Sequence, residues 1–437
     1  REAIQLVIDE LSAIKGLRVK SQEKTLLDMK KSTNSGSPFF AKRRLVADKT
    51  APCYISRHNT SWGVQTLQHL DQSKDGLLGP KHTMWNAAAI LGWRGQEGGY
   101  TKEDVKQRVV WMFPFAVNLM ELQVYQPLIQ AVKRTGVVPA WVSMEAVDSR
   151  VTKMFDTKRP EDAVICTDFS KFDQHFNPDM QRAARAVLEA LLDRADISRD
   201  WLEQVFPIKY DIPLAYDFGK IRVGKHGMGS GSGGTNADET LAHRALQHEA
   251  AWRSGTSLNP NSQCLGDDGV LTYPGITVED VIRTYTSHGQ EMNESKQYVS
   301  KHDCVYLRRW HHDGYRENGI CVGVYSTYRA LGRLMYQERY YDPEVWGPKM
   351  VALRQLSIIE NCKYHPLREE FAQFCMKRDK FRLGLDIPGF LDNIQSEAKK
   401  AIEFMPDFLG YTKSLQTTDA SKGINDWWIV KYLRDQR

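Results

Sequence analysis

The chain has 437 residues, of which 41% are hydrophobic and 26% are charged, and its formal net charge is +5. This length is sufficient for two or three subdomains with a large buried core. No apolar run is long enough to span a bilayer, so we expect no membrane partner. The positive charge suits a polyanionic partner but does not establish one. Seven scattered cysteines without metal-ligand spacing predict reduced thiols in an intracellular compartment rather than a disulfide framework or a zinc site.

The first part of the chain is predicted to begin with a helix and to continue through a polar loop. Apolar residues at helical spacing between Ile4 and Ile14 indicate the helix, and the loop spans residues 32–38. Basic residues cluster at 42–44 and again at 102–108, and either cluster alone indicates a solvated charged face. Residues 108–113 alternate in the manner of a strand.

The next predicted unit is a strand, a carboxylate and a helix in succession. Residues 161–167 have the composition of a short buried strand that ends at Asp168, and residues 179–193 read as an amphipathic helix. Taken alone, Asp168 is more simply interpreted as a helix N-cap or a turn residue.

A glycine-rich loop at 227–234 lies between a predicted strand at 221–223 and a predicted helix at 235–253. Such a loop lets the backbone approach a sugar or a template closely, because glycine lacks a Cβ atom. A flexible linker is the alternative, but a linker explains less well why the loop ends in Thr235 and Asn236 at a helix start. These residues and Asp173 are of the polar types that can recognise a ribose 2′-hydroxyl.

Two adjacent carboxylates, Asp267 and Asp268, follow Gly266 between a predicted incoming strand and the apolar Val270 and Leu271. A β-hairpin here would present acidic oxygens to divalent metal ions. The same residues also make a good hairpin turn that needs no metal, and the local sequence does not decide between the two interpretations. With a carboxylate from an adjacent strand, the pair could hold two ions about 4 Å apart, as in two-metal phosphoryl transfer.

Beyond about residue 330 the pattern is largely helical and rich in Tyr, Trp and Arg, which predicts a separate helical lobe. The segment 427–430 is apolar enough to dock on the protein or to stack on a base, and docking is the favoured interpretation. The aromatic residues of the predicted lobe include Tyr336, Tyr340, Tyr341 and Trp346.

Taken in order, these segments resemble the motifs of viral RNA-dependent RNA polymerases, and the surrounding sequence is similar to that of picobirnavirus enzymes, with partitivirus enzymes next. Asp168–Asp173 resembles motif A, Ser230-Gly231 with Thr235 resembles motif B, and Gly266–Asp268 resembles motif C. The further matches are Met292–Lys296 to motif D, Tyr306–Arg309 to motif E, Lys106–Arg108 to motif F and Ser35–Pro38 to motif G. Each motif alone is common by chance, but seven in family order between about residues 33 and 310 make the joint match specific.

The resemblance implies an α+β right-hand fold with fingers, a palm whose antiparallel sheet is flanked by helices, and a mainly helical thumb. The expected ranges are 1–160 for the fingers with the N-terminal segment, 161–180 for the palm, 181–222 for a fingers insertion, 223–325 for the palm again, and 326–437 for the thumb and tail. It also implies RNA synthesis with Mg²⁺ or Mn²⁺, with template, nascent RNA and ribonucleoside triphosphates as partners. The viral capsid protein is a further candidate partner, and the virion interior and the host cytoplasm are the expected locations.

Residue roles are implied in the same way. Asp168 and Asp267 would hold both metal ions with support from Asp268, and Lys296 would protonate the leaving pyrophosphate, although an ordinary surface lysine is the alternative. The predicted nucleotide contacts are Asp173, Ser230, Gly231, Thr235, Asn236, Glu239, Lys106 and Arg108. The predicted RNA contacts are Ser35, Gly36, Pro38, Arg308 and Arg309. A structural salt bridge is an equal alternative for either arginine.

One position departs from the family pattern. Motif B commonly places Asn four residues after its Thr, and here that position is Glu239, while an Asn stands at 236. The identity of this ribose contact is therefore open.

Two other functions are considered. A reverse transcriptase usually carries a bulky aromatic residue near the ribose, whereas this chain has Asp173 with small polar partners. A non-catalytic RNA-binding or capsid-associated protein with a polymerase-like shape is the second alternative.

Overall fold

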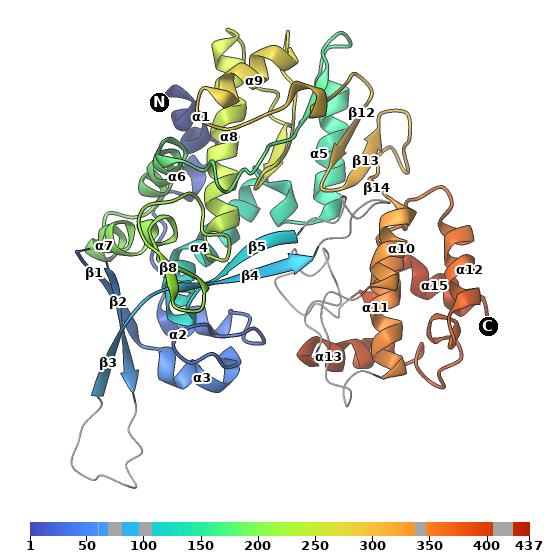
Figure 1. Ribbon diagram of the computed structural model, residues 1–437. Helices are drawn as coiled ribbons and strands as arrows, with labels where there is room; N and C mark the ends of the chain where they lie inside the picture. The colour runs from blue at the N-terminus through green and yellow to red at the C-terminus, as the bar shows by residue number, and fades with distance from the viewer. Residues whose placement is uncertain (60, 69–80, 96–106, 337–346, 405–422) are drawn as a thin grey trace. The chain divides into compact units, whose positions relative to one another are not determined.

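The computed structural model describes residues 1–59, 61–68, 81–95, 107–336, 347–404 and 423–437. These residues form two compact units (Figure 1). The first unit consists of Arg1–Arg94, Arg108–Val138 and Lys158–Lys301, and the second of Gly95–Gln107, Pro139–Thr157 and His302–Arg437.

The first unit mixes helices and strands along the chain. Its helices are α1 (Glu2–Glu10), α2 (Gln22–Leu27), α3 (Arg43–Thr50), α4 (Phe115–Thr135), α6 (Pro178–Leu191), α7 (Asp196–Gln204), α8 (Thr235–Arg253) and α9 (Val278–Thr286). Its strands are β1 (Cys53–His58), β2 (Ser61–Gln68), β3 (Lys81–Asn86), β4 (Ala89–Gly95), β5 (Gln107–Met112), β6 (Val164–Thr167), β7 (Leu214–Asp217), β8 (Lys220–Arg222), β9 (Gln263–Leu265), β10 (Asp268–Leu271) and β11 (Tyr298–Ser300).

A four-stranded antiparallel sheet in the order β11-β6-β10-β9 lies at the centre of this unit. The pairing of Gly269 with Thr167 fixes the register between β10 and β6. Because the two strands run in opposite directions, the end of β6 and the start of β10 meet at the same edge of the sheet. Asp168 and Asp268 are therefore brought to neighbouring strand ends.

Helix α8 packs against this sheet and is itself surrounded by α1, α6 and α9. Figure 1 shows α8 running between these helices. Its apolar residues Leu241, Ala242, Ala245 and Leu246 are buried, but so are polar residues on other faces of the helix. A helix that is buried on nearly all sides belongs to the core of its unit, and its polar side chains need partners there.

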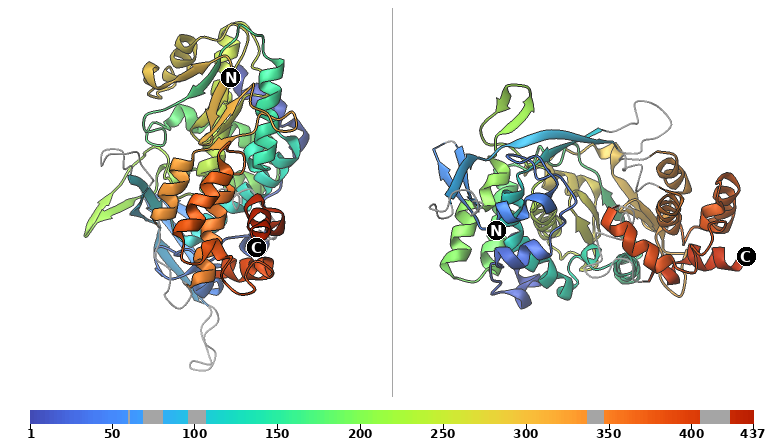
Figure 2. Two further views of the ribbon diagram at one scale, coloured as in Figure 1. Left: turned by 90° about the vertical axis from the view of Figure 1, so that its right-hand side faces the viewer. Right: turned by 90° about the horizontal axis from the view of Figure 1, so that it is seen from below.

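Two further sheets belong mostly to the first unit. One has the order β1-β2-β3 and the other the order β5-β4-β7-β8, in which β4 and β7 run parallel. Both views of Figure 2 show the β7–β8 hairpin projecting from the helices of this unit. Phe218, between these two strands, is fully exposed.

The second unit combines a small sheet with a helical cluster. Its elements are α5 (Met144–Thr157), β12 (Asp303–Tyr306), β13 (Arg309–His312), β14 (Val324–Tyr325), α10 (Thr327–Met335), α11 (Pro348–Glu360), α12 (Arg368–Arg378), α13 (Ile394–Phe404) and α15 (Trp428–Asp435). The three strands form an antiparallel sheet in the order β12-β13-β14. The predicted helical lobe beyond residue 330 is confirmed for the residues that the structure describes.

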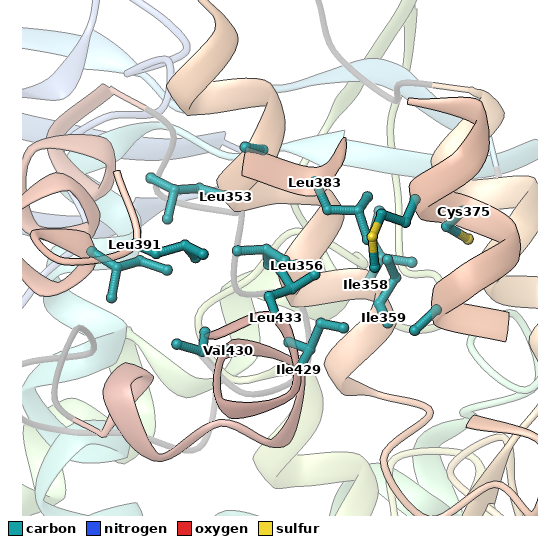
Figure 3. Close-up of a cluster of buried hydrophobic side chains, with 14 of the residues drawn as sticks. Leu353, Leu356, Ile358, Ile359, Cys375, Leu383, Leu391, Ile429, Val430 and Leu433 are labelled. Atoms are coloured by element: carbon teal, nitrogen blue, oxygen red, sulfur yellow. The ribbon is translucent and has the colours of Figure 1, made fainter. Parts of the chain in front are cut away.

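The C-terminal helix α15 docks on this helical cluster. Ile429, Val430 and Leu433 are fully buried and pack beside Leu356 and Ile359 of α11 (Figure 3). The carboxylate of Glu360 accepts the backbone N–H groups of Trp428 and Ile429 at 3.1 and 3.0 Å. Docking on the protein, the favoured interpretation of the apolar tail, is what the structure shows.

Most elements expected from the sequence lie where the pattern placed them. The helix predicted at 235–253 matches α8, the buried strand before Asp168 matches β6, and the helix predicted at 179–193 matches α6 within two residues. All seven cysteines are buried and free, as predicted, while their compartment stays a prediction. None of the described helices is long and apolar enough to cross a membrane. The five predicted finger, palm and thumb ranges stay predictions.

Candidate active site

The two adjacent carboxylates Asp267 and Asp268 occupy a tight hairpin turn. Leu265 pairs with Asp268, so Gly266 and Asp267 form the turn, and Gly266 has a φ of 58°. That φ favours glycine, because other residues rarely adopt it. The predicted hairpin is confirmed. Asp267 is exposed at the turn, and Asp268 is half-buried at the start of β10.

Helix α8 holds this turn from behind. The backbone N–H of Gly266 donates to Thr240 Oγ1 at 2.9 Å, and its carbonyl lies 2.9 Å from Nδ1 of His243. Burial lowers the pKa of His243 to about 4, so the ring is neutral and Nδ1–H donates to Gly266. A Cβ atom on Gly269 would lie 2.6 Å from the His243 ring. His243 and Thr240 were not predictable as site residues, because they lie within an ordinary helical sequence pattern.

Asp168 is held at the end of β6 by a side chain from a distant segment. The amide of Gln297 accepts the Asp168 N–H at 2.8 Å and donates to the Asp168 carbonyl at 2.8 Å. Gln297 is buried, whereas the neighbouring Lys296 is exposed and the Asp168 side chain is exposed. The residue that follows the segment resembling motif D is thus bonded directly to the backbone of the segment that resembles motif A.

The residues at this edge have the donor chemistry for a divalent ion. Asp168, Asp267 and Asp268 offer carboxylate oxygens, the ligands that Mg²⁺ and Mn²⁺ prefer. Two of the three are exposed, so their oxygens are accessible to an ion. Within the described ranges, however, no three His, Cys, Asp or Glu side chains already lie close enough together to hold a metal. The donor types and their strand-end positions fit a divalent ion, and the side chains would have to converge on it.

Glu239 faces Asp173 and forms a carboxyl pair with it. Glu239 is only 4% exposed, and its Oε2 atom accepts no hydrogen bond from any described group. Burial, the negative charge of Asp173 and a hydrogen bond to Asp173 raise the pKa of Glu239 well above its usual range. Burial also raises the pKa of Asp173, against the effect of its bond with Glu239. We assign the shared proton to Glu239, which can then donate to the Asp173 carboxylate.

Asn236 has a different position from Glu239. It is exposed, and its Nδ2 atom would lie 3.7 Å from a Cβ atom placed on Gly266, so it stands beside the carboxylate turn. Position 239, where the family commonly has Asn, therefore holds a glutamate that contacts Asp173. Asn236 lies instead beside the turn that contains Asp267. Both candidates of the sequence analysis lie close to predicted site residues.

The glycine-rich loop is packed tightly against the backbone around it. A Cβ atom on Gly227 would lie 2.5 Å from the Asp173 carbonyl, and one on Gly231 would lie 1.6 Å from the Trp111 carbonyl. The hydroxyl of Ser230 donates to the Val109 carbonyl of β5 at 3.2 Å. These contacts show a fixed loop and not the flexible linker that was the alternative.

The predicted finger contacts are only partly described. Arg108 is exposed, and its positive charge lowers the pKa of Asp173, so it faces the same region. Lys106 lies outside the described residues, as do Tyr340, Tyr341 and Trp346, and Tyr336 is exposed. No role for these residues is tested by the structure.

The polar loop at Ser35 differs from expectation. Ser35 is 1% exposed and its Oγ atom accepts the Ala41 N–H at 3.1 Å, so the hydroxyl shapes the loop. Gly36 is also buried, and its φ of 61° and its approach to the Phe113 carbonyl require glycine. A direct RNA contact by the Ser35 hydroxyl does not fit this burial, whereas Pro38 is exposed.

Arg308 and Arg309, in the second unit, have different environments. Leu307 and Arg308 form the turn between β12 and β13, with φ values of 52° and 61°. Arg309 is 8% exposed and donates two hydrogen bonds to Asp148 of α5, at 2.6 and 2.9 Å. For Arg309 the structure shows the salt bridge that was the alternative, because its guanidinium is buried and paired with Asp148.

Comparisons with known proteins agree with this fold. The family described as viral RNA-dependent RNA polymerase matches residues 92–317. A protein described as a potential RNA-dependent RNA polymerase, from human picobirnavirus (strain Human/Thailand/Hy005102/-), is 63% identical over 444 residues, which cover 100% of this chain and 80% of the relative.

Two solved structures are similar over the whole chain. The crystal structure of a human picobirnavirus RNA-dependent RNA polymerase has a TM-score of 0.90 and 63% identity, covering 100% of this chain and 79% of that one. An insertion-loop deletion mutant of such a polymerase has a TM-score of 0.88 and 60% identity, with the same coverage.

The fold and the strand-end carboxylates thus define a template-dependent nucleic acid polymerase of the right-hand class. The chain belongs to the viral RNA-dependent RNA polymerases. Within that family it resembles the picobirnavirus enzymes, and it is an RNA-directed RNA polymerase.

Proposed function

We propose that this polymerase replicates and transcribes a double-stranded RNA viral genome by two-metal nucleotidyl transfer. The main support is the position of Asp168 and of the Asp267–Asp268 turn, at neighbouring ends of β6 and β10. Bound there, two Mg²⁺ or Mn²⁺ ions would lower the pKa of the attacking hydroxyl and neutralise the triphosphate.

In this proposal the protein mainly positions groups and supplies charge. The 3′-hydroxyl of the nascent RNA attacks the α-phosphorus of the incoming nucleotide, the bond between the α-phosphorus and the bridging oxygen breaks, and pyrophosphate leaves. Lys296 is an exposed ammonium beside the Asp168 clamp, and it would donate a proton to the leaving group. Lys106 and Arg108 would bind the triphosphate, for which a guanidinium is well suited.

The ribose would be recognised by Asp173 with Ser230, Gly231, Thr235 and either Asn236 or Glu239. Glu239 orients Asp173 by donating its proton to one carboxylate oxygen, which leaves the other to accept the ribose 2′-hydroxyl. The short polar residues leave room for that hydroxyl. This supports an RNA polymerase over a reverse transcriptase.

The test is incorporation of labelled NTPs on a single-stranded RNA template, by the wild type and by Asp267→Asn and Asp268→Asn, with Mg²⁺ or Mn²⁺. We expect Asp267→Asn to lose at least about 10³-fold in rate and Asp268→Asn to lose less, because Asp267 would ligate both ions. A wild type that incorporates nothing with either metal would favour the non-catalytic alternative. Incorporation of dNTPs as fast as NTPs would favour a reverse transcriptase.

We further propose that the enzyme acts in the virion interior and in the host cytoplasm, with the capsid protein as a partner. This follows from the double-stranded genome in the proposal, since such a genome is copied within a particle. Co-sedimentation of the polymerase with purified capsids, compared with an unrelated protein of similar charge, tests the contact.

A further inference from the structure

The floor of the glycine-rich loop contains a carboxylate with no assigned role. Glu121 of α4 is 0% exposed. Its Oε2 atom accepts the hydroxyl of Ser232, and its Oε1 atom accepts the backbone N–H of Gly233 at 3.2 Å. Both hydrogen bonds accepted by this buried carboxylate thus come from the loop.

Asn118, one turn before Glu121 in α4, also forms hydrogen bonds with the glycine-rich loop. The Asn118 side chain donates to the Gly231 carbonyl at 3.4 Å and accepts the Gly233 N–H at 3.2 Å. The hydroxyl of Ser232 also accepts the Gly234 N–H at 3.0 Å. Three consecutive loop residues, 231–233, are therefore fixed to one face of α4.

The region beneath Glu121 is charged and closed to solvent. Lys209 Nζ lies 3.0 Å from Asp238 Oδ2, and both side chains are fully buried. Tyr125 and Tyr210 donate to the Asp238 carboxylate at 2.7 and 2.6 Å. With Lys209 already paired to Asp238, the partners that satisfy Glu121 directly are those supplied by the loop.

Burying a carboxylate is costly unless it is well hydrogen-bonded, so displacement of the loop would leave Glu121 unsatisfied. Burial raises the pKa of Glu121 to about 7, and Asp238 adds to this, while Lys209, Ser232 and Gly233 act in the opposite direction. Displacement of the loop that exposes Glu121 to water would therefore return its pKa toward the ordinary value of 4.5 and release a proton. The contribution of Glu121 to the loop position seen here is present at low pH and is lost as pH rises through about 7.

We propose that Glu121 is a positioning residue for nucleotide binding, which acts by fixing Ser232 and Gly233 between Ser230 and Thr235. The inference rests on the proposed function, in which Ser230 and Thr235 contact the incoming nucleotide. Glu121 itself does not touch the substrate. Its removal would allow the loop to shift and would weaken nucleotide binding more than the chemical step.

The experiment measures KM and kcat for NTPs, together with the melting temperature, for Glu121→Ala, Glu121→Gln, Ser232→Ala and the double variant Glu121→Ala/Ser232→Ala. We expect Glu121→Ala to raise KM about tenfold with a smaller change in kcat, and Glu121→Gln to restore most of the binding. The double variant should have the same KM as Glu121→Ala, because both substitutions remove the same hydrogen bond between Glu121 and Ser232.

Glu10→Gln is the matched control. Glu10 is a mostly buried carboxylate that pairs with Arg244 and makes no contact with the loop, so its loss should lower stability without raising KM. An equal rise in KM in this control would mean that KM reports general destabilisation, and would overturn the inference.

The pH dependence of KM separates positioning from a purely structural role. In the wild type KM should rise as pH rises through about 7, and in Glu121→Gln this component should be absent. If Glu121→Ala does not fold, Ser232→Ala and this comparison decide the question. If the wild type is active and these variants keep its KM, the role of Glu121 is refuted while the proposed function stands. If the wild type is inactive, the proposed function itself is refuted.

Discussion

Gln297 holds the Asp168 peptide by both of its polar groups, at 2.8 Å to the N–H and 2.8 Å to the carbonyl. Replacement by Ala leaves two partly buried backbone groups unsatisfied, which costs about 1–3 kcal/mol. Because a shift of a reacting group by about 1 Å can cost 10²-fold in rate, we expect the single-turnover rate to fall about 10- to 100-fold. Rapid-quench kinetics measures this.

The control for this prediction is Gln290→Ala. Gln290 is also buried, but it donates to the His175 carbonyl at 3.0 Å and not to the Asp168 backbone. The Gln290→Ala variant should be less stable than the wild type but should keep the wild-type single-turnover rate. Equal rate losses in the two variants would contradict a specific role for Gln297.

Gly231→Ala should prevent the glycine-rich loop from closing on β5. The added Cβ atom would lie 1.6 Å from the Trp111 carbonyl oxygen, a contact that only backbone displacement relieves. We expect a loss of at least about 100-fold in kcat/KM for NTPs. Gly347→Ala, where nothing lies within 4 Å of the added atom, should behave as the wild type.

Asp173→Ala should weaken the preference for NTPs over dNTPs. A hydrogen bond from a hydroxyl to a carboxylate is worth about 1.5–3 kcal/mol, so the ratio of kcat/KM for GTP and dGTP should fall about 10- to 100-fold. Glu239→Gln keeps a donor for Asp173 and should change this ratio little, whereas Glu239→Ala should lower it. A loss of discrimination in Asn236→Ala but not in Glu239→Ala would assign the ribose contact to Asn236.

Substitutions at the two neighbouring arginine sites should have different effects, on stability for the Arg309 pair and on RNA binding for Arg308. Asp148→Ala leaves Arg309 buried without its partner, which costs about 3–5 kcal/mol of stability. Arg308→Ala should reduce by about one the slope of log affinity against log salt concentration. Filter binding at several salt concentrations, with urea unfolding, measures both. A stable Asp148→Ala variant with weakened RNA binding would reverse the assignment.

The docking of α15 should depend on pH through Glu360. Burial raises the pKa of Glu360 to about 7, against the effects of the Ile429 N–H, Lys363 and the Trp428 N–H. Between its unfolded value of 4.5 and about 7, the folded state therefore holds more protons than the unfolded state. The free energy of unfolding should fall by up to about 3 kcal/mol as pH rises through this interval.

Glu360→Gln cannot ionise, so it should lose this slope while keeping an acceptor for the helix start. Hydrogen exchange of the amides of residues 428–435 at pH 5 and pH 8 measures the effect in both proteins. Identical pH dependence in the two would show that another group is responsible.

The sequence predicted the elements whose signal is local. The apolar composition before Asp168, the composition of 235–253 and the Gly-Asp turn each specify a strand, a helix or a hairpin with little help from the rest of the chain. The tertiary hydrogen bonds made by polar residues within these elements were not predictable in the same way. Glu121, His243 and Gln297 are single polar residues in ordinary patterns, and their partners lie far away in the chain.

Burial changes the interpretation of two residues in the predicted site. Ser35 and Arg309 match polymerase motifs in sequence, but motif order does not reveal that Ser35 is 1% exposed or that Asp148 pairs with Arg309. A polar side chain in a motif can either face the substrate or support the backbone that does. Only the tertiary structure distinguishes the two.

The contact between α1 and α8 has a consequence for how the chain folds as it is made. Arg244, 4% exposed, holds both oxygens of Glu10 across 234 positions and also donates to the Ser262 carbonyl at 2.7 Å. Burial alone would raise the pKa of Glu10, but the charge of Arg244 and its hydrogen bonds lower that pKa to about 2. Contacts this distant in sequence form late. During translation, the apolar face of α1 with Val7 and Ile8 therefore cannot complete its packing until α8 has left the ribosome.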